Sequence, residues 1–187
     1  ANQATGTTID TITNFEKIKG GSGDDTLIGS GTGNIIYGGI GRDFIFGGAG
    51  DDKLFGEEGN DSIVGGEGND SIYGGDGIDT VSYFDASSVV VTLRGSTNGT
   101  GEAVYGATTY NDKLYGIENV IGSAGNDTLQ GNEGGNILDG AGGINTVSYS
   151  GAAAGVTVDL GIVTQQDTIG DGRDTLIGFD NVIGSNL

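Results

Sequence analysis

Seven nine-residue blocks run without a break from Gly20 to Ser82, and this period constrains the fold more than any other feature of the 187-residue chain. Five blocks fit the pattern G-G-x-G-x-D-x-U-x, in which U is a large aliphatic residue. Glycines at positions one, two and four permit the positive φ of a tight turn. The x-U-x segment is a short strand whose central side chain faces one side. Two blocks therefore predict one eighteen-residue coil of an all-β parallel solenoid.

Position six of each block carries an acidic or amide side chain. Stacked coils place equivalent residues ~4.8 Å apart, so position-six side chains eighteen residues apart are expected to form a column on each edge. Carboxylates at this spacing repel one another. A hard cation with about six to eight oxygen ligands, held between adjacent coils, converts that repulsion into attraction. One column contains Asp25, Asp43, Asp61 and Asp79, and the other contains Asn34, Asp52 and Asp70.

A disordered, glycine-rich linker is the alternative, because 41 of the 187 residues are glycine. A linker gives no reason for large aliphatic residues to recur at an unbroken period of nine. We therefore favour the metal-bound solenoid and expect disorder in the absence of the ion. The recurring residues are Leu27, Ile36, Ile45, Leu54, Ile63, Ile72 and Val81.

The composition narrows the classes of function. Seven basic against 26 acidic residues give a formal net charge of -19, which disfavours a nucleic-acid or anionic-membrane partner. No apolar run approaches the length of a membrane span. The chain has no Cys and no His, which excludes disulfides, thiolate metal sites and triads of the Ser-His type. Since the repeat explains every acidic pair, we expect no enzymatic activity.

A longer period is superimposed on the nonapeptides. The segment 10–27 resembles 112–129, and 174–187 begins the same phrase again, while 79–93 resembles 145–160. We divide the chain into a lead-in coil (1–19), a first array (20–82), a strand, polar loop and second lead-in (83–121), a second array (122–148), and a strand, loop and third lead-in (149–187). The second array has Asn136 and Asn145 at position six, which predicts weaker cation sites.

The segments between the arrays have patterns of their own. Alternating V-x-V-x-L at 89–93 and 156–160 predicts two half-buried strands. The polar, glycine-rich stretch 95–111 predicts a loop, and no segment predicts a helix. Six apolar residues of the lead-ins are expected to point inward. They are Phe15, Ile18, Ile117, Val120, Phe179 and Val182.

Position nine of the first array is unusually apolar and is expected to face outward, with alternate blocks on opposite faces. One face would carry Tyr37, Phe55 and Tyr73, and the other Ile28, Phe46 and Val64. Two interpretations remain open. Either residues 83–115 cover one of these rows, or the rows form a subunit or ligand interface.

The nonapeptides, together with the phrases D-T-V-S-Y (79–83) and E-N-V-I-G (118–122), resemble the repeat regions of RTX proteins. The resemblance implies a parallel β-roll, several Ca²⁺ ions between its turns, and export from the cell by type I secretion. The implied side-chain ligands are Asp25, Asn34, Asp43, Asp52, Asp61, Asp70, Asp79, Asp127, Asn136, Asn145 and Asp174. The implied carbonyl ligands belong to Gly21, Gly23, Gly39, Gly41, Gly48, Gly50, Gly59, Gly66, Gly68, Gly75, Gly77 and Gly125.

Two functions follow from this resemblance as expectations. The first is a secreted structural or adhesive module that folds on binding calcium outside the cell. The second is an accessory calcium-binding domain of a larger RTX enzyme or toxin. Because both ends of the sequence lie in the same lead-in phrase, we also expect copies of the chain to stack head to tail into filaments or layers.

Overall fold

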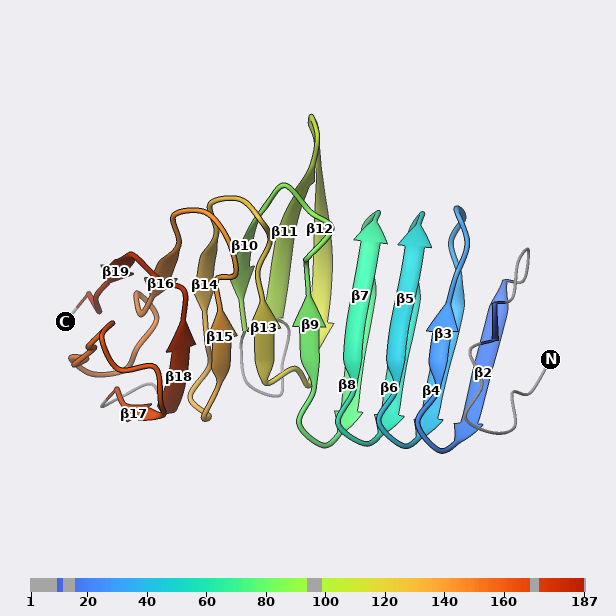
Figure 1. Ribbon diagram of the computed structural model, residues 1–187, viewed down its shortest axis with the longest axis horizontal. Coiled ribbons are helices and arrows are strands. Elements are labelled where there is room, and N and C mark those ends of the chain that lie inside the picture. Colours follow the sequence, from blue (N-terminus) through green and yellow to red (C-terminus); the bar gives the residue numbers. More distant parts are fainter. Residues whose placement is uncertain (1–9, 12–15, 94–98, 169–171, 187) are drawn as a thin grey trace.

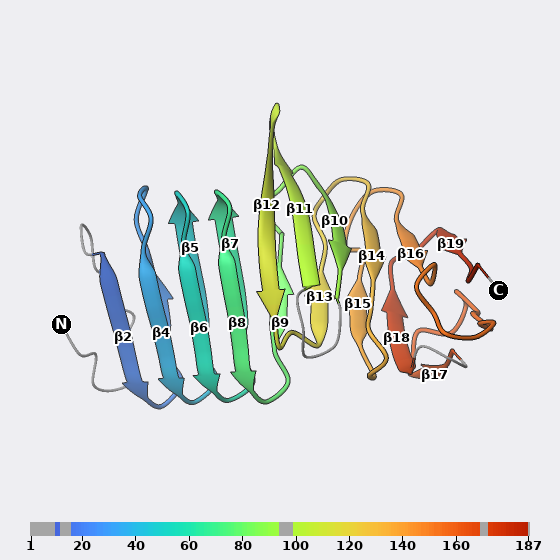
Figure 2. The same cartoon turned by 180° about the vertical axis from the view of Figure 1, so that it is seen from behind.

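The structure is a computed structural model that describes residues 10–11, 16–93, 99–168 and 172–186. Within these ranges the chain forms strands and turns and no helix, as the sequence predicts. No helix able to cross a membrane occurs in this part of the chain. Figures 1 and 2 show a single row of coils, with the two ends of the chain at opposite ends of the row.

The strands form two sheets that face each other across the row of coils. The order of one sheet is β1 (Asp10–Thr11), β3 (Thr26–Ile28), β5 (Phe44–Ala49), β7 (Ser62–Glu67), β9 (Thr80–Ser82), β13 (Asn119–Ile121), β15 (Ile137–Asp139), β18 (Arg173–Ile177) and β17 (Gln166–Asp167). The order of the other is β2 (Lys17–Ser22), β4 (Ile35–Ile40), β6 (Lys53–Glu58), β8 (Ser71–Asp76), β12 (Thr108–Tyr115), β11 (Gly99–Tyr105), β10 (Ser88–Thr92), β14 (Thr128–Gln130), β16 (Thr146–Ser148) and β19 (Asn181–Ile183).

The register of the sheets confirms the eighteen-residue coil. In the first array each strand pairs in parallel with the strand one coil further on, so Ile36 lies beside Leu54 and Ile45 beside Ile63. The U side chains of both sheets point into the space between the sheets and form the core. All seven that were predicted from the first array are at most 1% exposed. The period of nine thus predicts both the pairing and the core.

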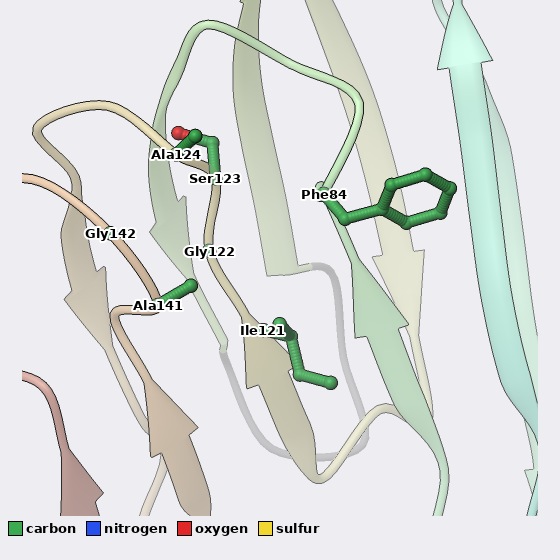
Figure 3. Close-up of a pocket in the computed structure, with 7 residues that line it drawn as sticks. All are labelled: Phe84, Ile121, Gly122, Ser123, Ala124, Ala141 and Gly142. Carbon is green, nitrogen blue, oxygen red and sulfur yellow. The ribbon is translucent and has the colours of Figure 1, made fainter.

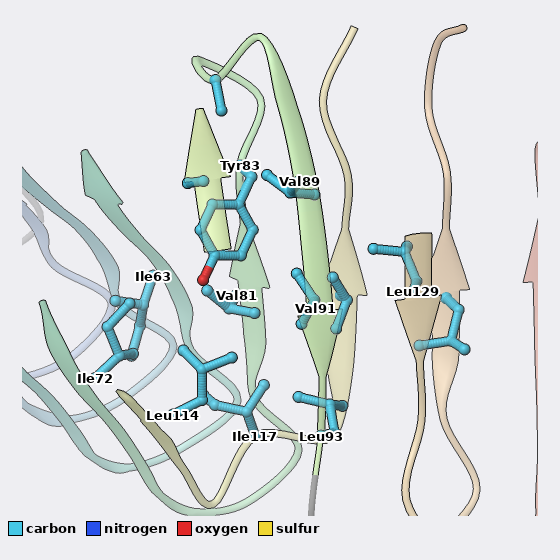
Figure 4. Close-up of a cluster of buried hydrophobic side chains, with 14 of the residues drawn as sticks. Ile63, Ile72, Val81, Tyr83, Val89, Val91, Leu93, Leu114, Ile117 and Leu129 are labelled. Carbon is cyan, nitrogen blue, oxygen red and sulfur yellow. The ribbon is translucent and has the colours of Figure 1, made fainter. Parts of the chain in front are cut away.

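The core continues from the first array into the second without interruption. Val81, Val91, Leu114 and Ile117 belong to this core where the two arrays join, with the ring of Tyr83 beside them, and Val91 pairs with Leu129 of the second array (Figure 4). Further along, Leu138, Val147 and Leu176 extend the same cluster.

The prediction of a loop is wrong over 99–111, because β11 and β12 form an antiparallel hairpin there, and residues 95–98 lie outside the described residues. The hairpin inserts between β10 and β8, and its tip extends beyond the other strands (Figure 1). Gly106 has a φ of 63° in the two-residue turn that connects the strands. Alternate residues of β11, such as Ala103, are buried although the segment is polar overall.

The two V-x-V-x-L segments have different structures. The first forms β10, with Val89 and Val91 buried and Val90 half-exposed, as predicted. The second is not a strand, although Val156, Val158 and Leu160 pack against the core. The difference is one of pairing, since β10 has β11 and β14 as neighbours and 156–160 pairs with no described strand.

The lead-in residues mostly point inward, as expected. Ile18, Ile117 and Val120 are buried, and Phe179 is half-buried against the core. Val182 is 40% exposed, contrary to the prediction, because β19 pairs on one side only, with β16. Phe15 lies outside the described residues.

The position-nine residues form the two predicted rows. The rings of Tyr37, Phe55 and Tyr73 stack with centroids 4.7 Å apart, and Tyr115 continues the stack at 4.5 Å. On the opposite face Phe84 packs against Phe46 at 6.5 Å. Phe84 of the segment 83–115 thus covers part of this second row, in which Val64 is 0% exposed, whereas β10, β11 and β12 extend a sheet instead of lying on a row.

Candidate metal sites on the coil edges

Backbone hydrogen bonds to side chains confirm the two columns of position-six residues. Each position-six N–H donates to the Oδ1 atom of the position-six residue in the next coil. On one edge, Asp25 donates to Asp43, Asp43 to Asp61 and Asp61 to Asp79, all at 2.8 Å. On the other edge, Asn34 donates to Asp52 at 2.6 Å and Asp52 to Asp70 at 2.9 Å.

Both columns continue past the first array through residues that the sequence analysis missed. The N–H of Asp79 donates to Oε2 of Glu118, and that of Asp70 donates to Oδ1 of Asp112. In the last coil the N–H of Asn145 donates to Oδ2 of Asp180. The sequence does contain a pattern that marks these residues. Segments 112–115, 118–121 and 180–183 match positions six to nine of the nonapeptide, with an acidic residue at position six and an aliphatic residue at position eight.

The predicted position-six residues of the second array belong to the same columns. Asp127 accepts the N–H of Val89 and donates its own N–H to Oδ1 of Asn145. Asn136 donates its N–H to Oδ1 of Asp174. The structure thus brings the predicted side-chain ligands to the two edges of the coils, where β10 and β11 separate Asp112 from Asp127 on one edge.

The second carboxylate oxygen of five of these residues has no partner. The Oδ2 atoms of Asp43, Asp52, Asp61, Asp70 and Asp79 are buried and accept no hydrogen bond. A buried, ionised acceptor without a donor is strongly destabilising. The described ion pairs, Lys19–Glu57 and Arg42–Asp24, are exposed and include none of the five. No cation of the protein therefore neutralises these carboxylates within the described part of the chain.

Each unpartnered Oδ2 lies against the position-one glycine of its own block, where no side chain fits. A Cβ atom on the position-one glycine of the same block would overlap Oδ2, as at Gly56 with Asp61. For four of the five blocks the same Cβ would also overlap a position-one carbonyl of the next coil, such as that of Gly74. A carboxylate oxygen and a carbonyl oxygen from adjacent coils thus lie beside the same glycine and close to each other. This arrangement fits a hard cation with oxygen ligands.

The remaining ligands must come from the backbone, because no three acidic side chains of the described residues converge on a common point. The predicted carbonyl ligands at positions two and four belong to glycines that line the same turns. All of those in the first array have positive φ, and the carbonyls of six of them face the equivalent glycine of the next coil, as Gly21 faces Gly39. In the second array the carbonyl of Gly125 faces Gly143 in the same way.

Burial raises the pKa values of the column carboxylates. Desolvation is the largest cause at each residue, and it raises the pKa of Asp43, Asp52 and Asp79 to about 6. The pKa of Asp70 rises to about 8, because the neighbouring carboxylate of Asp112 adds to the desolvation. The pKa of Asp61 is also raised by desolvation. In the metal-free fold, burial therefore destabilises the ionised form of these aspartates.

These shifts predict how the metal-free fold responds to pH. An aspartate of the unfolded chain has a pKa of about 3.9, so between that value and the raised values the fold binds more protons than the unfolded chain. Its stability is then greatest below about pH 4 and is lost as the pH rises through about 6 to 8. In excess chelator, thermal unfolding followed by circular dichroism is expected to show a more stable first array at about pH 5 than at about pH 8. Stability that rises with pH under these conditions would contradict the assignment.

A second prediction concerns the space beside Oδ2. Gly56→Ala places a methyl group against Oδ2 of Asp61 and the carbonyl of Gly74, and is expected to destabilise the fold by about 1–3 kcal/mol and to weaken calcium binding. Gly31→Ala is the control, because a Cβ there meets no atom within 4 Å. The measurement is the calcium midpoint of folding for both variants. Equal midpoints would show that the space at Gly56 is not part of a metal site.

A shallow pocket lies beside the junction of the two arrays and differs from the coil-edge sites. Its lining consists of Phe84, Ile121, Gly122, Ser123, Ala124, Ala141 and Gly142 (Figure 3). These residues include no acidic or basic side chain, and the hydroxyl of Ser123 donates to Asp127. The pocket therefore adds no ligand to the candidate metal sites.

A parallel β-roll with a column of carboxylates along each coil edge defines a class of metal-binding solenoid. A family model described as RTX calcium-binding nonapeptide repeat (4 copies) matches residues 19–54, 46–81 and 114–147, which together make up more than half of the chain. The chain belongs to this family, and its nonapeptide repeats bind calcium ions. No curated protein matches the chain.

Proposed function

We propose that this chain is a secreted structural or adhesive module whose folding depends on calcium. The observation that supports the proposal best is the set of five buried Oδ2 atoms without hydrogen-bond donors. A fold that buries these charges needs a cation, so binding and folding are coupled. Calcium sites in extracellular modules have dissociation constants of about 10⁻⁴–10⁻³ M, which would make folding wait until the chain is outside the cell.

The proposal includes self-association through the coil that ends in β19. Among the described strands this one pairs with β16 alone, and Val182 and Ile183 are 40% and 47% exposed. A strand edge with apolar side chains is a template for another strand. A second copy that added a coil at β19 would make a heterologous contact, which extends into filaments instead of closing into a ring.

Sedimentation velocity, in millimolar calcium and in excess chelator, tests both parts of the proposal. We expect a compact species with calcium, an expanded species with chelator, and larger assemblies as the protein concentration rises in calcium. An unchanged frictional ratio on chelation would contradict calcium-dependent folding. A single monomeric species at every concentration would contradict self-association.

A further inference from the structure

We propose that the blocks from Gly38 to Ser82 require calcium, and that the second array (122–148) folds without it. The inference rests on the proposed coupling of calcium binding to folding. It comes from a comparison of the position-six side chains with one another. In the five aspartates of 38–82 the Oδ2 atom has no hydrogen-bond partner. In the other buried position-six side chains from Asn34 onward, the atom at the same place has one. Three different groups provide that partner.

The first group is the backbone N–H of position two. Ser30 donates to Oδ1 of Asn34 at 2.7 Å, and Asn132 donates to Oδ1 of Asn136 at 2.9 Å. Ser123 donates its N–H to Oδ2 of Asp127 at 2.7 Å and its hydroxyl to Oδ1 at 2.8 Å. In these three blocks the turn of the block itself satisfies the position-six side chain. We call the five blocks whose Oδ2 atom has no donor open blocks.

The conformation of position two explains why other blocks remain open. In four open blocks position two is glycine, with φ between 99° and 124° at Gly39, Gly48, Gly66 and Gly75. The fifth open block has Glu57 there, and this residue also has a positive φ of 78°. Ser30, Ser123 and Asn132 do not have positive φ. The sign of φ at position two therefore separates open blocks from those that donate an N–H to position six.

The second group is the side-chain amide of Asn145. The position-two residue of this block, Ala141, has a positive φ of 55°, as in the open blocks. Its N–H donates to Asp139 and not to the position-six side chain. The Nδ2 atom of Asn145 donates to the carbonyls of Gly140, Gly142 and Gly178, each at 2.9 Å. Its Oδ1 atom accepts the N–H of Asp127, which fixes the orientation of the amide.

The Nδ2 atom of Asn145 occupies the place that the unpartnered Oδ2 atom has in the open blocks. A Cβ on Gly140 would meet Nδ2 of Asn145 at 2.6 Å and the carbonyl of Gly178 at 2.7 Å. This is the arrangement of Gly56 with Oδ2 of Asp61 and the carbonyl of Gly74. An oxygen at this place repels the carbonyls, whereas an N–H₂ group donates to them. The asparagine therefore satisfies the turn without metal.

The third group is a buried tyrosine at the end of each T-V-S-Y phrase. The hydroxyl of Tyr83 donates to Oδ2 of Asp112 at 3.0 Å, and that of Tyr149 donates to Oδ2 of Asp174 at 3.1 Å. Both rings are at most 1% exposed, and Figure 4 shows the ring of Tyr83 inside the core. Each tyrosine thus satisfies a column carboxylate by a neutral donor.

The distribution of these donors divides the solenoid into two parts. The second array and its flanking carboxylates are satisfied internally, so their polar groups impose no need for metal. The first array retains five carboxylates with an unsatisfied Oδ2 atom, which need a cation when they are ionised. Since β12 and β13 pair with β8 and β9, these two strands of the segment 83–121, folded together with the second array, would present two strand edges on which the first array assembles when calcium arrives.

Hydrogen exchange of the full chain, with millimolar calcium and with excess chelator, tests the inference. The amides of β14 and β16 are expected to stay protected in both conditions, whereas those of β5 to β8 lose protection in chelator by about tenfold or more. Loss of protection in β14 and β16 together with β5 to β8 would overturn the inference. Protection of β5 to β8 in chelator would instead overturn the proposed function, so the two failures are distinguishable.

The variant Asn145→Asp tests the amide directly, because it exchanges a donor for an acceptor of the same shape. It is expected to remove the protection of β14 and β16 in chelator by about tenfold and to restore it in calcium. Asn126→Asp is the matched control, since Asn126 is exposed and its Oδ1 only accepts the N–H of Ile144. Unchanged protection of Asn145→Asp in chelator would overturn the role of the amide. Loss that calcium does not reverse would also overturn it.

Discussion

Removal of calcium is expected to unfold the first array of the β-roll. The strands β3 to β9 stack five buried carboxylates whose Oδ2 atoms have no hydrogen-bond donor, and the chain carries a formal net charge of -19. Without the ions, these charges make the stacked coils less stable than the solvated chain. Circular dichroism in excess chelator is expected to lose the β signal of this array, and added calcium is expected to restore it cooperatively.

Magnesium provides the control for this experiment. It prefers an octahedral site and retains its water ligands, so it is expected to restore far less structure than calcium at the same concentration. A β spectrum that is the same in chelator and in calcium would contradict the account of the first array. Equal recovery with sodium chloride would attribute the effect to screening of the net charge instead of to specific sites.

Loss of one carboxylate in the middle of a column is expected to raise the calcium concentration needed for folding. Asp61 accepts the N–H of Asp43 and donates its own N–H to Asp79, so Asp61→Ala disturbs two interfaces between coils. Asp43→Ala is expected to behave in the same way. Asn136→Ala is expected to change the calcium midpoint much less, because Asn136 is satisfied by Asn132 and by the carbonyl of Glu118.

The midpoint of a calcium titration, followed by circular dichroism, measures these effects. Removal of a ligand that bridges two coils is expected to raise the midpoint by about tenfold, which corresponds to about 1.4 kcal/mol. Glu58→Ala removes one negative charge from an exposed position outside the columns and is the control for net charge. Midpoint shifts of equal size for Asp61→Ala and Asn136→Ala would refute the model of stacked columns.

The sequence alone predicts the solenoid and its first array well. The period of nine determines which aliphatic residues form the core, and the period of eighteen determines which aspartates share a column. Both follow from local rules, because every block repeats the same turn and the same short strand. The alternation of Tyr37, Phe55 and Tyr73 with Ile28, Phe46 and Val64 follows from the same two periods.

The hairpin β11–β12 was not predictable from composition. Its polar and glycine-rich residues are typical of a loop, and it forms strands because it fills the space between β10 and β8. The failure of 156–160 to form a strand has the same origin. A pattern of alternation predicts which side chains are buried, but a strand also needs a partner strand, and pairing depends on the rest of the fold.

The candidate site was predicted in part. The columns were expected, but Asp112, Glu118 and Asp180 were missed because only the last four residues of the nonapeptide surround them. Which blocks need metal depends on the sign of φ at position two and on the donors of Tyr83 and Asn145. Tyr83 lies 29 residues from the carboxylate that it satisfies. Such contacts exist only in the folded chain, so the consensus pattern cannot reveal them.

Anomalous diffraction from crystals of the full chain grown in calcium tests the central claim most directly. The account predicts calcium peaks beside Oδ2 of Asp43, Asp52, Asp61, Asp70 and Asp79, between adjacent coils, and none at the amide of Asn145. Calcium peaks confined to the exposed acids of the turns, with Oδ2 of these five aspartates vacant, would contradict it.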